Sequence, residues 1–288
     1  MGKLLGQIRA GLIFSGFIAA VLVCLPIQAV LVFIWPHGAK LLPQLFFKFH
    51  LWLAGITCVQ KGVPYVPLKG EPGCLMVANH VSYFDASALG ASTPVSFVAK
   101  TEVAGWPVFG IMAKLARTVF INRNIRGNAG KDAVQIQARL YDGDNIVLFP
   151  EGTSWDGVKI LPFKSALFGA AESEKGKILV QPVSQTYRRI WGLPLDRRTR
   201  PFFAWYGDMD FIPHKWAAYV RGPFEVVVRF HSPVSPSSFL SRREMAAWCE
   251  DVVRRGVLHD RDGRAGDPEL PLIPDLEAAA KEQNMAAE

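Results

Sequence analysis

Asn79-His80-Val81-Ser82-Tyr83-Phe84-Asp85 places a histidine and a carboxylate directly behind a short apolar run, residues 74–78. The apolar run predicts a buried strand that ends in polar residues. An imidazole can take up a proton near neutral pH, and a carboxylate on its other ring nitrogen fixes the tautomer and stabilises the imidazolium. Positions five apart do not share a helix face, because successive residues turn by about 100°. The pair therefore meets only if His80 lies in a turn and Asp85 lies at the start of a helix over about residues 86–89.

The same stretch also has a purely structural interpretation, in which Asp85 is the N-cap of that helix and His80 is a surface loop residue. The chain contains six histidines, so one such spacing can arise by chance. The motifs further along the chain decide between the two interpretations.

The composition indicates a basic, apolar chain that is long enough for a full α/β core. It has 288 residues, 50% of them hydrophobic, a formal net charge of +7 and a mean hydropathy of +0.18. This charge favours anionic partners such as lipid headgroups, phosphates or an acidic carrier protein. Nucleic acid is not expected, because the chain has no zinc finger, RNP sequence or basic recognition helix.

The four cysteines predict neither disulfides nor a metal site. They are scattered and contain no CxxC pair: Cys24, Cys58, Cys74 and Cys249. This usage is typical of reduced thiols in a reducing compartment. No zinc is expected, because the spacing offers no ligand set and HExxH is absent.

The N-terminus predicts attachment to a membrane. Residues 10–35 contain no charged side chain, and about 20 apolar residues suffice to cross a hydrocarbon core. A signal peptide does not fit, because its apolar region spans only about 7–15 residues and ends in a small-x-small cleavage site. Pro26 would kink a helix here, so a hairpin that enters one leaflet fits at least as well as a full span.

Residues 41–57 predict an amphipathic helix at the membrane interface. The apolar side chains that recur at helical spacing are Leu42, Leu45, Phe46, Phe49, Trp52, Leu53 and Ile56. Basic residues lie on both sides of the first segment: Lys3, Arg9, Lys40 and Lys48. The positive-inside rule therefore gives no clean orientation.

Beyond about residue 64, short apolar strands alternate with helical patterns. We expect strands at 74–78, 95–99, 118–121, 145–149, 178–184 and 224–230, and helices at about 106–116, 129–141, 163–174 and 242–255. Ser241 and Glu244 have capping-box spacing at the last helix. The alternation predicts an α/β fold with a mainly parallel sheet. We divide the chain into membrane helices (1–60), an α/β domain (61–260) and a polar, flexible tail (261–288).

Three further clusters lie at the ends of predicted strands, where the loops of such sheets carry chemistry. Phe120-Ile121-Asn122-Arg123, with Arg126 and Lys131 following, can direct a guanidinium onto a phosphate or carboxylate. Phe149-Pro150-Glu151-Gly152-Thr153 presents Glu151 at a tight turn, for an acceptor's hydroxyls or for Arg123. Val180-Gln181-Pro182-Val183 contains a proline, which predicts a sheet edge or a bulge. Each cluster alone also fits a solvated charge or an ordinary turn.

The NHVSYFD stretch resembles the NHxSxxD block of the PlsC-like glycerolipid acyltransferases, the family of the 1-acyl-glycerol-3-phosphate acyltransferases. The other three clusters resemble the remaining blocks of that family in the same order, and together the blocks cover about residues 74–184. Four ordered blocks are a much stronger signal than one motif. The resemblance implies a mixed α/β sheet, flanked by helices, behind an N-terminal two-helix membrane motif.

The resemblance also implies transfer of a fatty acyl group from a thioester, acyl-CoA or acyl carrier protein, to the free hydroxyl of a lysolipid, with no other cofactor. By similarity His80 is the general base and Asp85 its orienter. The substrate-binding residues by similarity are Ser82, Arg123, Glu151, Gly152 and Thr153. A hydroxyl deprotonated by His80 attacks the thioester directly, and such help is worth about 10²–10⁴-fold. Ser82 as a covalent nucleophile is the rival, but the chain has no G-x-S-x-G elbow.

One departure from the family pattern bears on the acceptor. Ser154-Trp155-Asp156-Gly157 stands where many phosphate-using members carry a basic residue, and Lys159 and Lys164 come only later. A carboxylate at Asp156 would repel a phosphate and could pair with an ammonium group. On family frequency we expect 1-acyl-glycerol-3-phosphate, which gives phosphatidic acid. Lyso-ornithine lipid is the alternative, because the Ser-x-Asp-Gly run and residues 161–164 resemble that branch.

Two other functional classes stay open at this stage. A lipase or thioesterase is disfavoured by the missing nucleophile elbow, and a non-catalytic lipid-binding protein is disfavoured by the intact His80 and Asp85. The expected partners are membrane lipid, a lysolipid acceptor and the acyl thioester. The expected location is the bacterial inner membrane, with the active site facing the cytoplasm.

Overall fold

The computed structural model describes residues 2–35, 38–122, 129–172 and 177–274. In these residues one eight-stranded sheet has the order β1-β8-β6-β2-β5-β3-β4, and β7 pairs with β6. β6 pairs antiparallel with β7 and β8, and the remaining pairs are parallel. The mixed, mainly parallel sheet is therefore confirmed. Its strands are β1 Thr57–Lys61, β2 Leu75–Ala78, β3 Ser96–Lys100, β4 Val119–Ile121, β5 Ile146–Leu148, β6 Val180–Ile190, β7 Leu193–Pro194 and β8 Phe224–Phe230.

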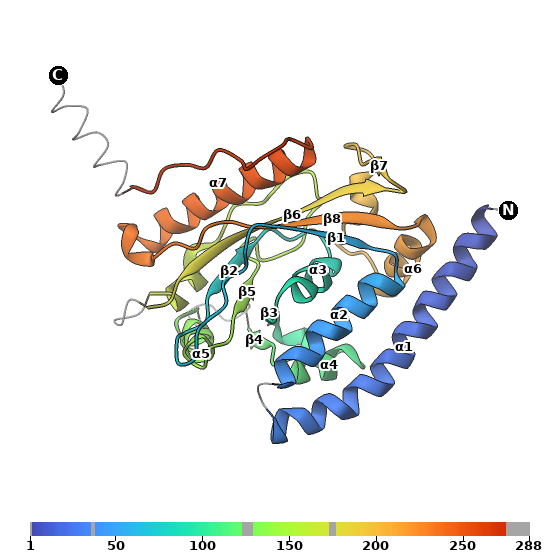
Figure 1. The fold of residues 1–288 in the computed structure, drawn as a ribbon, viewed down its shortest axis with the longest axis horizontal. Coiled ribbons are helices and arrows are strands. Elements are labelled where there is room, and N and C mark those ends of the chain that lie inside the picture. Colours follow the sequence, from blue (N-terminus) through green and yellow to red (C-terminus); the bar gives the residue numbers. More distant parts are fainter. Residues whose placement is uncertain (1, 36–37, 123–128, 173–176, 275–288) are drawn as a thin grey trace.

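Helices cover both faces of this sheet, with α7 on one side and α2 and α3 on the other (Figure 1). The α-helices are α1 Gly2–Ile34, α2 Leu41–Leu53, α3 Phe84–Ser92, α4 Phe109–Leu115, α5 Ala129–Tyr141, α6 Phe211–Arg221 and α7 Arg242–Arg261. The 3₁₀ helices are η1 Gly38–Lys40, η2 Thr101–Gly105, η3 Ser165–Ala170, η4 Arg200–Phe202 and η5 Pro236–Ser238.

β2 shows how the two layers are built. Its four residues are all fully buried, as expected of a central strand with helices on both faces. Leu75 and Val77 pack into an apolar cluster with α5 and α7, whereas Met76 and Ala78 pack into a second cluster with α1, α2 and α3. Side chains alternate across a strand, so the continuous apolar run supplies both cores.

The parallel strands bring several loops to one edge of the sheet. β2 pairs in parallel with β5, β5 with β3, and β3 with β4. Parallel strands end at the same edge, so the residues that follow β2 and β5, including His80 and Glu151, lie close together. Polar residues from two predicted motifs thus meet at one place.

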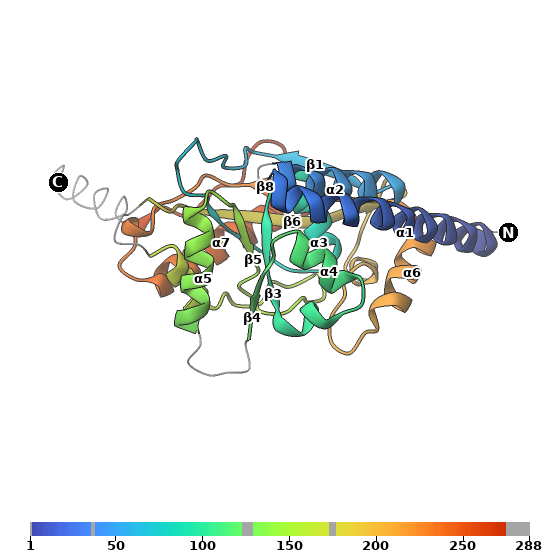
Figure 2. The same cartoon turned by 90° about the horizontal axis from the view of Figure 1, so that it is seen from below.

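α1 and α2 lie side by side along one side of the molecule (Figure 2). α1 continues through Pro26. In the described residues it is the one helix long and apolar enough to cross a membrane. Its exposed apolar side chains include Leu4, Leu5, Ile8, Leu12, Leu22, Val23, Val30, Phe33 and Ile34. Arg9 ties α1 to the domain, since its guanidinium donates hydrogen bonds to the carbonyls of Ala54 and Tyr219, at the ends of α2 and α6.

Several elements differ from the sequence expectations, including three segments. β1 crosses residue 60, so the end of the first segment belongs to the sheet. In residues 163–172, the described part of the 163–174 pattern, the one helix is the short 3₁₀ helix η3. α7 extends to Arg261, and the indole of Trp248 donates to the carbonyls of Pro271 and Leu272 in the segment that follows. Ser241 is confirmed as the N-cap, because its hydroxyl accepts the N–H of Glu244, whereas the Glu244 carboxylate accepts the N–H of Leu240 and not that of Ser241.

Pro182 was expected to mark a sheet edge or a bulge, and neither lies at this residue. β6 lies inside the sheet, between β8 and β2, and its register shift falls further along, between Tyr187 and Arg189. Pro182 accepts the N–H of His231 but has no N–H to return. Nε2 of Gln181 donates to the His231 carbonyl instead, at 2.8 Å. A side chain thus replaces the missing ladder bond, and the proline stays inside the sheet.

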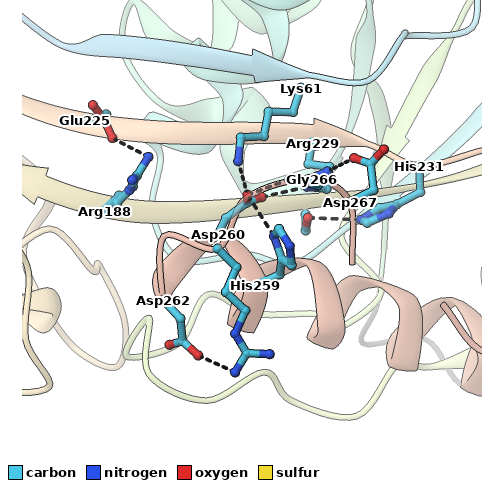
Figure 3. A network of polar contacts seen from close by, with 12 residues as sticks. Lys61, Arg188, Glu225, Arg229, His231, His259, Asp260, Asp262, Gly266 and Asp267 are labelled. Carbon is cyan, nitrogen blue, oxygen red and sulfur yellow. Dashed lines mark hydrogen bonds and ion pairs between the residues drawn. The ribbon is translucent and has the colours of Figure 1, made fainter. Parts of the chain in front are cut away.

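A buried ion-pair network joins β1, β8 and the end of α7 (Figure 3). Asp260 is fully buried and accepts hydrogen bonds from Arg229 at 2.8 and 2.9 Å and from Lys61 at 2.7 Å. Arg229 also reaches Asp267, beyond α7. Burial alone would raise the pKa of Asp260, but these hydrogen bonds outweigh it and hold the pKa below its ordinary value. The network fixes α7 against the edge of the sheet.

Candidate active site

His80 and Asp85 form a hydrogen-bonded pair just beyond the end of β2. Nδ1 of His80 lies 2.8 Å from Oδ2 of Asp85, which sits in the first turn of α3. The same oxygen accepts the backbone N–H groups of Val81, at 2.6 Å, and Ser82, at 2.9 Å. The turn thus wraps around the carboxylate, which explains how two residues five positions apart meet. Because Nδ1 faces Asp85, Nε2 is the ring nitrogen available to a substrate.

Tyr187 completes the surroundings of Asp85. Its hydroxyl donates to Oδ1 at 2.7 Å, from the interior of β6. Both side chains are buried. Burial, with the nearby charge of Asp85, raises the pKa of Tyr187 well above its ordinary value, so the phenol stays a donor. Asp85 therefore accepts four hydrogen bonds.

Two neighbouring side chains hold the position of His80. The ring of Phe149 stacks on the imidazole, with centroids 4.0 Å apart and planes at 15°. Asn79 is locked to β6, because its side chain donates to the Gln185 carbonyl at 3.0 Å and accepts the Gln185 N–H at 2.8 Å. The His80 side chain keeps 21% exposure. The imidazole is therefore fixed and still reachable.

Glu151 lies behind the backbone of His80. One carboxylate oxygen accepts the His80 N–H at 2.6 Å and the other accepts the Leu161 N–H at 2.7 Å. Burial raises the pKa of Glu151 to about 7, against these two hydrogen bonds, which lower it. Gly152 follows with φ +78, and a Cβ there would lie 2.7 Å from Nζ of Lys164. Only glycine adopts this turn without strain while leaving room for the lysine.

The other predicted substrate-binding residues fall into three groups. Thr153 is exposed beside the site, and its hydroxyl donates to the Ser154 carbonyl at 3.4 Å. Ser82 is fully buried under the turn. Arg123 and Arg126 lie outside the described residues, and Lys131 is exposed in the first turn of α5. The described residues thus bring His80, Asp85, Ser82 and the 149–153 turn together, and the substrate-binding roles stay predictions.

Comparison with known proteins agrees with this architecture. An acyltransferase family model matches residues 57–186. The lyso-ornithine lipid O-acyltransferase of Brucella abortus is 38% identical over 258 residues, which cover 87% of this chain and 94% of that protein. The chain belongs to the PlsC-like acyltransferase family. The 1-acyl-sn-glycerol-3-phosphate acyltransferase of Neisseria gonorrhoeae is 44% identical over 190 residues, 66% of this chain and 71% of that protein.

A solved structure supports the fold of this acyltransferase. The crystal structure of PlsC, the 1-acyl-sn-glycerophosphate acyltransferase of Thermotoga maritima, covers 93% of this chain and 100% of its own, with a TM-score of 0.66. The two chains are 23% identical. This likeness shows a shared fold, and the roles of individual residues rest on the geometry above.

The structure also defines the positions of three further residues of this acyltransferase. Lys100 ends β3 and is exposed at the same edge of the sheet as His80. The sequence could have indicated it, because a lysine directly follows the strand predicted at 95–99. The Trp205 N–H donates to the Val81 carbonyl at 3.0 Å, so a distant loop holds the turn that carries His80. Oδ1 of Asp156 accepts the N–H groups of Val158 and Lys159 at 2.8 and 2.9 Å, which makes Asp156 a turn-forming residue.

Proposed function

We propose that this acyltransferase moves a fatty acyl group from an acyl thioester, acyl-CoA or acyl carrier protein, to the free hydroxyl of a lysolipid, with His80 as general base. The observation that carries the proposal is the buried Asp85 carboxylate, 2.8 Å from Nδ1 of the part-exposed His80. This contact fixes the tautomer with Nε2 unprotonated, and it stabilises the imidazolium that forms when Nε2 takes up a proton.

The transfer has two steps, which are attack of the acceptor hydroxyl on the thioester and departure of the thiolate. Nε2 of His80 removes the proton of the acceptor hydroxyl as its oxygen attacks the thioester carbonyl. The C–S bond then breaks, and the imidazolium returns the proton to the leaving thiolate. An acyl-enzyme is not needed, and the burial of Ser82 argues against one, because a nucleophile must reach the carbonyl carbon.

For the acceptor we propose lyso-ornithine lipid first and 1-acyl-glycerol-3-phosphate second. The Brucella abortus relative, named for the first, aligns over 87% of this chain, whereas the Neisseria gonorrhoeae relative, named for the second, aligns over 66%. Asp156 is weaker support for this order of acceptors than its sequence position suggested, because one of its oxygens already accepts two backbone N–H groups of its own turn.

The test is a competition assay with the purified full-length protein, one acyl thioester and equal amounts of both lysolipids. Mass analysis identifies the acylated products. We expect acylated lyso-ornithine lipid to predominate. Phosphatidic acid as the main product would reverse the order of acceptors, and no acylated product with any lysolipid would favour the non-catalytic lipid-binding alternative.

We further propose that α1 lies in the membrane interface and does not span the bilayer. Near its start, Arg9 bonds to the ends of α2 and α6. Near its end, Nε2 of Gln28 donates to the carbonyls of Ala39 and Leu115 at 2.8 and 2.9 Å. Because α1 is held to the domain near both ends, it can lie along the membrane surface with its exposed apolar side chains in contact with lipid. The active site then faces the cytoplasm, where thioester donors are made.

Salt washing of membranes that contain the full chain tests this attachment. Buried apolar area does not respond to salt, whereas the attraction of basic residues to anionic lipid is screened within about 10 Å at 0.1 M. We expect the protein to stay with the membrane at high salt and to leave it only in detergent. Release by salt alone would mean that α1 is not inserted.

A further inference from the structure

We infer that Glu151 is a positioning residue, which holds the backbone of His80 and does not contact the acceptor. The inference rests on the proposed role of His80 as the base. It differs from the acceptor-binding role that the family resemblance implies for this carboxylate. The two roles predict different kinetic changes, so they can be told apart.

The first argument is that both carboxylate oxygens are occupied. Oε1 accepts the N–H of His80 at 2.6 Å, and Oε2 accepts the N–H of Leu161 at 2.7 Å. The residue is only 2% exposed. A lysolipid hydroxyl would have to displace one of these short hydrogen bonds to reach the carboxylate. The geometry therefore directs Glu151 at the protein backbone.

The second argument is the side of the sheet on which Glu151 lies. The imidazole of His80 stacks on Phe149, which belongs to the apolar cluster shared by α1, α2 and α3. Glu151 lines a small cavity together with His80, Ile160 and Val257 of α7. The carboxylate thus lies behind the His80 backbone, on the α7 side.

The third argument is what the two bonds join. Leu161 follows the 149–153 turn by several residues, and His80 follows β2, so one carboxylate links two loops that otherwise belong to separate strands. A buried carboxylate without partners would be costly, and two N–H donors are what compensates it. Removing the carboxylate leaves the His80 N–H without an acceptor. The turn that carries the imidazole then loses one of its supports.

A small displacement of that turn is sufficient to slow the reaction. Misplacing a reacting group by about 1 Å can cost about 100-fold in rate. The amide of Glu151→Gln can accept only one of the two N–H groups, because its nitrogen is itself a donor. We expect Glu151→Gln to lower kcat by about 10–100-fold and to change the KM for the acceptor by less than about twofold.

Glu250→Gln is the matched control. Glu250, a residue of α7, also accepts a backbone N–H, from Phe163 at 2.9 Å. It makes no contact with His80 among the described residues, so its substitution should leave kcat unchanged. Glu151→Asp is the second variant, because the shorter side chain keeps the charge but can hold only one loop. Its kcat should fall between those of wild type and Glu151→Gln.

Hydrogen exchange at the His80 amide supplies a readout that does not depend on turnover. We expect this amide to exchange at least tenfold faster in Glu151→Gln, with an unchanged rate in Glu250→Gln. A raised acceptor KM with unchanged kcat and unchanged exchange would overturn the inference in favour of acceptor binding. His80→Ala is assayed in parallel, and full activity of this variant would disprove the role of His80 as general base. The exchange rate of the His80 amide in Glu151→Gln would still test the contact between Glu151 and the backbone.

Discussion

The hydroxyl of Tyr187 donates a 2.7 Å hydrogen bond to Oδ1 of Asp85 across 102 positions of sequence. The other oxygen of Asp85 holds the imidazole of His80 and the backbone N–H groups of the turn. Oδ1 of Asp85 therefore binds Tyr187, whereas Oδ2 binds the imidazole and the turn. The long strand β6 provides the donor that keeps the orienting carboxylate in place.

Tyr187→Phe should weaken both stability and catalysis. A hydrogen bond to a charged group is worth about 1.5–3 kcal/mol, so we expect a loss of that size in urea unfolding. We expect kcat to fall roughly tenfold, because Asp85 gains freedom to turn. Tyr219→Phe is the control, since it removes a buried hydroxyl bonded to His50 at 2.7 Å. Equal kcat losses in both variants would contradict a specific role for Tyr187.

Ser82→Ala should leave activity within about threefold of wild type. The side chain is fully buried, and Ser82 contacts Asp85 through its backbone, whose N–H donates to Oδ2 and whose carbonyl accepts the Asp85 N–H. Alanine keeps that N–H, so the turn is preserved. Turnover of the variant and intact-mass analysis of the enzyme with acyl donor alone are the measurements. A well-folded but inactive variant, or an acyl adduct in the wild type, would restore the acyl-enzyme route.

Lys215→Met should stabilise the protein at neutral pH. The amine of Lys215 lies 4.2 Å from the ring centroid of Phe17, among further aromatic rings, and among the described residues no carboxylate pairs with it. Burial lowers its pKa from 10.5 to about 7. Each tenfold loss of proton affinity is worth about 1.4 kcal/mol, so about 5 kcal/mol is the ceiling on the penalty, and contacts with the rings reduce it.

The lowered pKa of Lys215 determines how the stabilisation by Lys215→Met depends on pH. Between pH 10.5 and 7 the unfolded chain holds the Lys215 proton while the folded chain releases it, so the penalty grows as the pH falls. Calorimetry should therefore find a raised Tm for Lys215→Met at pH 7 and little difference above pH 10.5. Lys215→Arg should destabilise, because arginine stays charged. A lower Tm for the methionine variant at pH 7 would contradict this account.

Asp260→Asn should be strongly destabilising. It leaves Arg229 and Lys61 without their buried partner, and breaking such a pair costs about 3–5 kcal/mol. The lowered pKa of Asp260 means that its stabilisation is present above the unfolded pKa and is lost as the pH falls through the folded value. The difference between wild type and variant in urea should therefore shrink on acidification below about pH 4. Asp262→Asn, at an exposed pair, should cost less than about 1 kcal/mol.

The sequence predicted the fold and the contact between His80 and Asp85, because both depend on local signals. The apolar run before Asn79 is a strand buried on both faces, and the spacing of His80 and Asp85 requires a strand–turn–helix, which is what the structure contains. β8 was predicted with its observed ends, because three consecutive valines between two phenylalanines mark a buried strand.

What the sequence did not reveal depends on contacts between distant segments. Nothing around Tyr187 indicates that its hydroxyl will meet Asp85, since that follows from the register of β6 beside β2. The direction of Glu151, toward the backbone of His80, likewise depends on how two loops meet. Pro182 was misplaced at an edge because the compensating bond from Gln181 to His231 exists only in the folded sheet.

The most direct test of the central claim is the turnover of His80→Ala beside wild type, with one thioester donor and lyso-ornithine lipid, in protein shown to be folded by its melting curve. The account predicts a fall in kcat of about 10²–10⁴-fold, the contribution of a general base, with a Tm close to that of wild type, because the imidazole is part-exposed and not a core element. Turnover within a few-fold of wild type, in a folded variant, would contradict it.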